Sequence, residues 1–161
     1  MAKRIPILAA GLVLVMAALG PAGAAASAGG TNLPMNGTGT GHTAIDQLTG
    51  ATSGDSTGVA THFGQFTAHL DGQAAGTTFT GTGNLVAADG DQITDTISAT
   101  ITPTSPTSID VVGTLTITGG TGRFEDASGS AEFIDHNSLD SVVGTTALTS
   151  DHFTIKGQIS Y

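Results

Sequence analysis

The sequence contains no cysteine and no tryptophan, and it has one tyrosine and four lysine and arginine residues among 161. Without cysteine the chain can form no disulfide, so its stability must come from packing alone, and the lipid-modified cysteine of a lipoprotein is excluded. The strong helix formers leucine, glutamate, lysine and arginine are scarce, and glycine occurs 24 times. Both features argue against long helices.

Residues 1–28 have the three-part layout of a secretory signal peptide. A positively charged start precedes an apolar run over residues 5–19, and small residues precede two candidate cleavage points, after Ala26 and after Ala28. The run is shorter than the ~20 residues of a membrane-spanning helix, so cleavage is favoured over an uncleaved anchor. We therefore expect a secreted or extracytoplasmic protein, of the bacterial type that an alanine-rich leader indicates, with no membrane association after cleavage.

Removal of the leader leaves a strongly acidic chain. Arg123 and Lys156 are then the two fixed positive charges against all 13 acidic residues, a net charge of −11. Such a surface repels phosphate backbones and anionic lipids, so we expect neither nucleic acid nor a membrane surface as a partner. About 133 residues remain, which is enough for one domain with a sizeable core.

The mature chain is rich in threonine, valine, isoleucine and glycine, and its apolar residues alternate with polar ones in short segments. This alternation predicts β-strands rather than a disordered chain. We expect a flexible leader over residues 29–40, a turn-rich break over 50–56 and a β-domain over 41–161. The predicted strands, eight or nine in number, cover residues 38–48, 57–62, 66–71, 77–87, 92–102, 109–118, 127–135, 141–149 and 151–160.

Tight turns join these segments, most clearly at Asp89-Gly90, where an Asp-Gly pair between two alternating runs predicts a hairpin. Regular short strands with one apolar and one threonine-rich face indicate an antiparallel sandwich or barrel, and the residues alone leave both open. No segment has helical periodicity over three turns, which excludes an α/β fold.

A family resemblance decides between the two. The strand at 109–118 runs into Gly119-Gly120-Thr121-Gly122, and an aromatic residue and a small-residue strand entry follow. This order resembles the turn shared by the plant allene oxide cyclase and dirigent barrels. A second block, residues 58–67 (GVATHFGQFT), and the closing residues 157–161 (GQISY) resemble bacterial exported proteins with the same barrel. The residues that match the plant turn are Ile117, Gly119, Gly120, Gly122, Phe124, Ala127 and Gly129.

The resemblance, which covers most of residues 37–161, implies an all-β fold: an antiparallel, eight-stranded, calycin-like (allene oxide cyclase-like) β-barrel after the signal peptide. The plant proteins cyclise a fatty-acid epoxide or steer phenoxy radical coupling, mainly by shaping an apolar cavity around the substrate. They often form dimers or trimers, which leaves a homo-oligomer open here. No catalytic residue of those families matches a numbered residue of this chain, so the resemblance transfers none.

Asp95 is the sharpest candidate for a catalytic or ligand-binding residue. Alternation along the strand at 92–102 puts it on the face of Ile93, Ile97 and Ile101. An acid inside a barrel would have a raised pKa and could act as a general acid. The alternatives are a place at the barrel mouth, or a bulge that turns the side chain outward.

Arg123 and His62 are weaker candidates. Arg123 could clamp an anionic ligand, but an ion pair with the adjacent Glu125 and Asp126 explains it more simply. His62 lies in the block that resembles the bacterial proteins and could bind a ligand or bond across a strand end. His69 and His152 are predicted to face outward.

We expect no metal and no cofactor. The sequence has no His-x-His pair, and Asp89-Gly90-Asp91 lacks the later glutamate of a calcium loop. The glycine turn at 119–122 is not followed by the lysine of a phosphate-binding loop.

Three functions remain. The favoured one is non-catalytic binding of a small apolar molecule, or scaffolding. The others are a cyclase or isomerase like the plant barrels and a structural envelope protein. An interior cavity of roughly 300 Å³ or more would favour binding or catalysis. An interior filled by phenylalanines 63, 79, 133 and 153 with Leu115 would favour the structural role.

Overall fold

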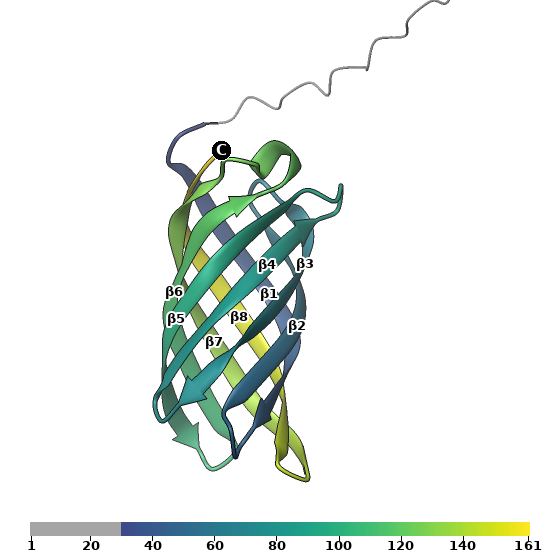
Figure 1. Cartoon of the computed structure of the whole chain (residues 1–161), viewed down its shortest axis with the longest axis vertical. Helices are drawn as coiled ribbons and strands as arrows, with labels where there is room; N and C mark the ends of the chain where they lie inside the picture. Colours follow the sequence, from purple (N-terminus) through teal and green to yellow (C-terminus); the bar gives the residue numbers. More distant parts are fainter. Residues whose placement is uncertain (1–29) are drawn as a thin grey trace, which may run out of the picture.

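The computed structural model describes residues 30–161, which form a closed antiparallel barrel of eight strands (Figure 1). Each strand pairs with its neighbours in sequence, and β1 pairs with β8 to close the wall. The predicted eight-stranded barrel is confirmed, and the predicted signal peptide lies outside the described residues. The strands are β1 (Leu33–Asp46), β2 (Ala51–Ala60), β3 (Gly64–Ala75), β4 (Thr78–Ala87), β5 (Gln92–Ser105), β6 (Ser108–Gly120), β7 (Ser128–Val143) and β8 (Thr146–Ser160).

Helix is almost absent from this part of the chain: one short 3-10 turn, η1 (Gly122–Phe124), follows β6. Within residues 30–161 no helix has the length and apolar character needed to cross a membrane.

Several strand boundaries differ from those predicted. β1 begins at Leu33, so residues 33–40 belong to the wall and not to a flexible leader. Residues 51–56, predicted as a break, lie in β2 because their backbone pairs with β1 and β3 on both sides. β7 and β8 are long continuous strands with their turn at residues 144–145, where three shorter strands were predicted. Pairing on both edges overrides the weak strand propensity of these small residues.

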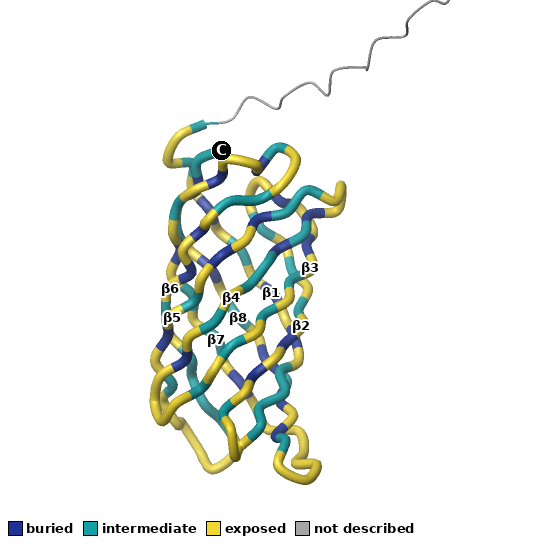
Figure 2. The backbone as a smooth tube through the Cα atoms, viewed as in Figure 1, coloured by how far each residue is buried: buried dark blue, intermediate teal, exposed yellow. Residues whose placement is uncertain are grey.

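Side chains alternate between the interior and the solvent along most of each strand, as Figure 2 shows by its alternating colours, and the lower ends of β5 and β7 are exposed throughout. Glycines on the inner face make room for phenylalanines of the neighbouring strand. A methyl group at Gly39 would lie 2.5 Å from Phe153 Cζ, and one at Gly58 would lie 2.7 Å from Phe66 Cζ. The high glycine content therefore serves interior packing as well as turns.

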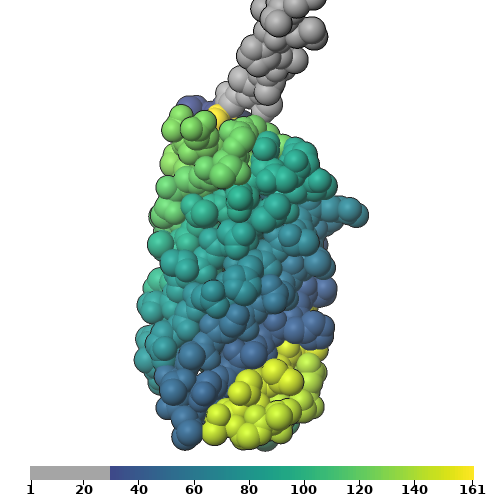
Figure 3. Space-filling model, turned by 45° about the vertical axis from the view of Figure 1, so that its right-hand side comes forward, coloured from purple at the N-terminus to yellow at the C-terminus, as the bar shows by residue number. Residues whose placement is uncertain are grey.

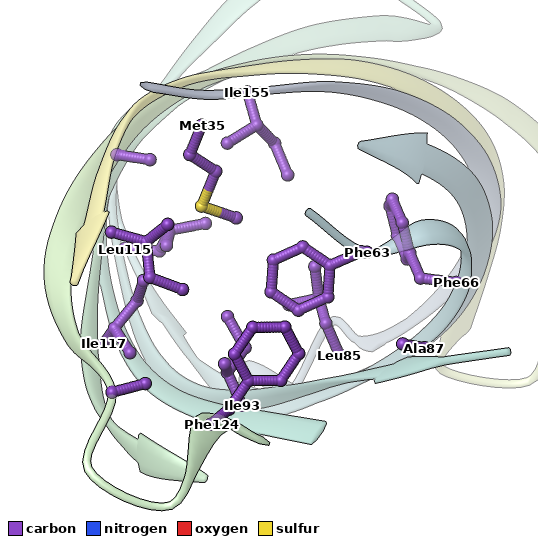
Figure 4. Packing of buried hydrophobic residues seen from close by; sticks show 13 residues of the cluster. Met35, Phe63, Phe66, Leu85, Ala87, Ile93, Leu115, Ile117, Phe124 and Ile155 are labelled. Atoms are coloured by element: carbon purple, nitrogen blue, oxygen red, sulfur yellow. The ribbon is translucent and has the colours of Figure 1, made fainter. Parts of the chain in front are cut away.

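The two ends of the barrel differ. The upper end in Figure 1 carries the C-terminus, η1 and the β2–β3 and β4–β5 turns, and the other four turns form the lower end. Phe63 and Phe124 stack across the upper end with ring centroids 4.6 Å apart, and Tyr161 meets the Phe124 ring edge-on at 4.8 Å. Figure 4 shows these two phenylalanines projecting into the lumen among the buried cluster.

The packed core thus occupies the upper half of the barrel. Met35, Ile93, Phe124 and Ile159 are completely buried there. Of the predicted interior residues, Phe63 and Leu115 are buried in this core, and Phe79 is buried near the lower end of β4. Phe133 and Phe153 are only half-buried. The interior is therefore not filled along its whole length.

Candidate site in the lower half of the barrel

A cavity of about 140 Å³ lies below the packed core. Its wall is mainly aliphatic and aromatic, and half-buried residues such as Ile45, Ile101 and Ile109 line it toward the lower end. The volume is below the roughly 300 Å³ typical of pockets for drug-sized ligands. It is close to the ~150 Å³ of an engineered apolar cavity that binds benzene. The barrel is therefore neither filled nor widely hollow.

Asp95 points into this cavity from β5, as the sequence pattern predicts. The side chain is 3 % exposed, and its Oδ1 atom has no hydrogen-bond partner among the described residues. Burial alone raises the pKa of Asp95 to about 6. A register shift does occur beside Asp95, but the unpaired residue, Thr118, is on β6, so the alternation along β5 is kept.

Gly83 on β4 pairs directly with Asp95. A methyl group at Gly83 would lie 3.0 Å from Asp95 Oδ1 and 3.3 Å from Oδ2. The absence of a side chain at residue 83 therefore leaves the carboxyl group open on the side of β4.

A second carboxyl group, that of Asp135 on β7, lines the same cavity. Its Oδ2 accepts a hydrogen bond from Asn137 Nδ2 at 2.8 Å, while its Oδ1 is buried without a partner among residues 30–161. Thr149 Oγ1 donates to Asn137 Oδ1 at 3.1 Å and so fixes the orientation of the amide. Burial, followed by the nearby charge of Asp151, raises the pKa of Asp135 to about 7.

Asp151 on β8 is the third inward carboxyl group and is 9 % exposed. Thr43 Oγ1 donates to its Oδ2 at 3.1 Å. Burial raises the pKa of Asp151 as well, and the bond from Thr43 opposes that rise. Three acidic side chains therefore face the interior. Among them, Asp151 alone receives a hydrogen bond from a hydroxyl group of the described residues, at its Oδ2.

Arg123 and His62 lie at the upper end, away from this cavity. Arg123 Nη1 contacts both Asp89 and Asp91 of the β4–β5 turn, the latter at 3.1 Å, and the guanidinium carbon lies 4.5 Å from the centre of the Phe124 ring. The ion pairs found here thus involve Asp89 and Asp91, where the sequence suggested Glu125 and Asp126.

His62 adopts a left-handed backbone conformation, with φ 70°, in the β2–β3 turn. Its Nδ1 lies 3.3 Å from the Tyr161 hydroxyl group, and its carbonyl oxygen accepts a hydrogen bond from Arg123 Nη2 at 3.1 Å. The structure therefore brings Arg123 and His62 together at the upper end of the barrel and leaves Asp95 apart from both.

The other histidines lie on the outer wall. His69 Nδ1 lies 2.7 Å from Asp55 Oδ1 and its Nε2 lies 3.1 Å from Asp71 Oδ2; these two acids raise the pKa of His69. His136 Nδ1 lies 2.6 Å from Asp110 Oδ1. Residues 30–161 contain no group of three or more potential ligands arranged to hold a metal ion.

Sequence reasoning missed Asp135 and Asp151. The alternation that identifies an inner face is present for both. Asp135 has the spacing of Ala131 and Phe133, and Asp151 has the spacing of Phe153 and Ile155, so each acid shares a face with these apolar residues. The predicted strands ended or began at these two acids, so neither was read as an interior position.

No protein-family model matches the chain, and no curated protein matches it. Among solved structures, the barrel is similar to that of the pterocarpan synthase dirigent protein GePTS1, with 13 % sequence identity and a TM-score of 0.39. The alignment covers 82 % of this chain and 88 % of that one. The eight-stranded barrel rests on the strand pairing described above and not on this likeness.

Proposed function

We propose that the barrel binds a small apolar molecule, about the size of a single ring, in the cavity below its packed core. The observation that carries the proposal is the buried carboxyl group of Asp95, whose Oδ1 faces an apolar cavity with no hydrogen-bond partner in the described part of the chain. An unsatisfied buried polar group costs about 1–3 kcal/mol. A bound molecule that donates a hydrogen bond would remove that cost.

The cavity is smaller than the roughly 300 Å³ expected of a pocket for a larger ligand, so the proposal is confined to a one-ring molecule. The unfilled space still supports binding over a purely structural role. A barrel that only needed stability would gain by filling the space between Ile97, Phe133 and Phe153 with larger side chains, because each methyl-sized void costs ~1 kcal/mol. These three residues line the cavity and are half-buried. We also propose that the protein acts after export, as the leader predicts.

The test uses benzyl alcohol, a neutral one-ring probe, and calorimetric titration of the purified protein. We expect saturable binding at one site, and we expect Ala68→Leu, which places a larger side chain in the cavity, to abolish it. Thr67→Leu is the matched control, because Thr67 is exposed on the outer face of the same strand. Binding that survives Ala68→Leu, or no binding at all, would overturn the proposal.

A second candidate is acid catalysis on such a molecule, as in a cyclase or isomerase. The pKa values of Asp95 and Asp135, raised to about 6 and about 7, favour it, because a general acid works best near the ambient pH. Turnover of a small epoxide, lost in Asp95→Asn or Asp135→Asn while benzyl alcohol still binds, would establish it. If both variants turn the epoxide over as fast as the unmodified protein does, neither acid is a catalytic residue.

A further inference from the structure

We infer that the molecule held in this cavity is a small apolar amine, bound as its ammonium ion at the buried carboxyl groups of the cavity wall, those of Asp95 and Asp135. The inference rests on the proposed binding function and adds the charge of the ligand.

The interior has acidic groups and no cation. Asp95 and Asp135 line the cavity and Asp151 also faces inward, whereas no lysine or arginine among residues 30–161 lines it. His69 contributes to the wall from β3, but its ring is bonded to Asp55 and Asp71 on the outer face. Arg123 is bonded to acids at the upper end, and Lys156 is exposed on the outer face of β8. A buried carboxylate without a compensating charge is costly, so a positively charged ligand would be strongly favoured.

The two unpartnered atoms are acceptors. Asp95 Oδ1 and Asp135 Oδ1 are both buried and receive no hydrogen bond within the described chain, and both residues line the one cavity. An ammonium group carries three donors and no acceptor, and a charge-assisted bond to such an oxygen is about twice as strong as a neutral one. A primary amine therefore matches what the cavity lacks.

The rest of the wall determines the body of the ligand. Apart from these acids the cavity is bounded mainly by aliphatic and phenylalanine side chains, among them Ile97, Phe133 and Phe153. A volume of about 140 Å³ accommodates roughly one ring. A carboxylate of the same size would meet the two acids of the wall with no lysine or arginine beside them, so we expect no anion to bind.

The decisive experiment compares three probes of nearly equal size and different charge: benzylamine, benzyl alcohol and benzoate. Calorimetric titration of the unmodified protein at pH 8 should give benzylamine at least about tenfold tighter binding than benzyl alcohol, since a charge-assisted hydrogen bond adds about 1.4 kcal/mol or more. Benzoate should show no binding. Equal affinities for amine and alcohol, with Ala68→Leu abolishing both, would leave the proposed function intact and overturn this inference.

Variants then locate the charge preference. Asp95→Asn and Asp135→Asn should each lower the preference for benzylamine, measured as the ratio of its affinity to that of benzyl alcohol for the same variant. Glu132→Gln is the control, because it removes one negative charge from the outer face of β7. The inference is overturned if Glu132→Gln lowers the preference as much as the interior variants do, since the effect would then come from the overall charge of the chain.

The dependence on pH is an independent readout that needs no variant. The titratable residues that line the cavity are Asp95, Asp135 and His69, whose ring is held on the outer wall by Asp55 and Asp71. Asp151 acts on Asp135, and the other charged or titratable neighbours of these two acids are His42, Asp110, His136 and His152. An alkyl ammonium stays protonated below pH 9, so the affinity for benzylamine should rise between pH 5 and pH 8 as the carboxyl groups ionise. The affinity for benzyl alcohol should not rise, and a parallel rise for both probes would overturn the inference.

Discussion

Arg123 Nη2 donates a hydrogen bond to the backbone carbonyl oxygen of His62 at 3.1 Å, which connects the η1 turn after β6 to the β2–β3 turn across the upper end of the barrel. The same guanidinium group contacts Asp89 and Asp91 of a third turn. One side chain therefore joins three turns that are distant in sequence.

Arg123→Ala should lower the free energy of unfolding by about 2 kcal/mol, because hydrogen bonds to a charged group are lost while their partners remain. The Arg123 side chain is 19 % exposed, so solvent replaces these bonds poorly. Chemical denaturation measures the change. Lys156→Ala, which removes the other fixed cation of residues 30–161, should change stability by no more than about 0.5 kcal/mol. Equal effects would show that Arg123 acts only through net charge.

Phe124→Ala should destabilise the barrel by about 3–5 kcal/mol. Phe124 is completely buried and stacks on Phe63, so its loss opens a void in the packed core. Phe133→Ala is the comparison, because Phe133 is half-buried against the existing cavity and should cost less. Denaturant unfolding of both variants tests the order, and a larger loss for Phe133→Ala would contradict the division into a packed and a hollow half.

The interior acids should make the unliganded protein less stable as the pH rises from about 4 to about 7. The pKa of Asp95 is raised from its ordinary value to about 6, so the folded state keeps a proton that the unfolded state has already lost. Raising the pKa of Asp95 from its ordinary value to about 6 corresponds to a loss of roughly 3 kcal/mol of folding stability across this pH range. The pKa of Asp135, raised to about 7, extends the window upward.

Thermal unfolding from pH 4 to pH 8 measures this loss. Asp95→Asn should flatten the decline and be more stable than the unmodified protein at pH 8. His69, whose pKa is also raised, acts in the same direction, but its side chain is 45 % exposed and its contribution is small. A decline of equal slope in Asp95→Asn would mean that Asp95 is not the group that titrates.

Gly39→Ala should destabilise the barrel by about 1–3 kcal/mol through overpacking. The added methyl group would lie 2.5 Å from Phe153 Cζ and 2.6 Å from the backbone oxygen of Thr57, which cannot move aside easily. Gly83→Ala is the matched control, because its nearest neighbour is the Asp95 side chain at 3.0 Å. Comparable melting temperatures for the two variants would show that the backbone contact at Gly39 is not limiting.

Alternation along the chain predicts the antiparallel strands and one of the three interior acids, and the family resemblance predicts that the strands form a barrel. Period-two alternation identifies Asp95 because Ile93, Ile97 and Ile101 make the inner face of β5 obvious. The same alternation passes through Asp135 and Asp151, but the polar residues around them look like strand ends, so the predicted strands stop or start at these acids. Only the continuous pairing of β7 with β8 carries the inner face through both positions.

The cavity itself follows from neighbours that no local pattern reveals. Phe153 fills space above Gly39 on the adjacent strand β1, and Asp95 lies opposite Gly83 on β4. Whether a barrel is filled depends on such pairs, which are set by register across the closed sheet. Alternation along one strand gives the facing of each side chain but not the volume left between them.

The backbone N–H of Tyr161 donates to the carbonyl oxygen of Gly30 at 3.2 Å, so the described chain enters and leaves the barrel at its upper end. The lower end carries only turns, and Figure 3 shows the β7–β8 hairpin there in yellow. A barrel attached to a surface or fused to another domain through either of these residues would therefore hold its lower half, which contains the cavity, away from the point of attachment.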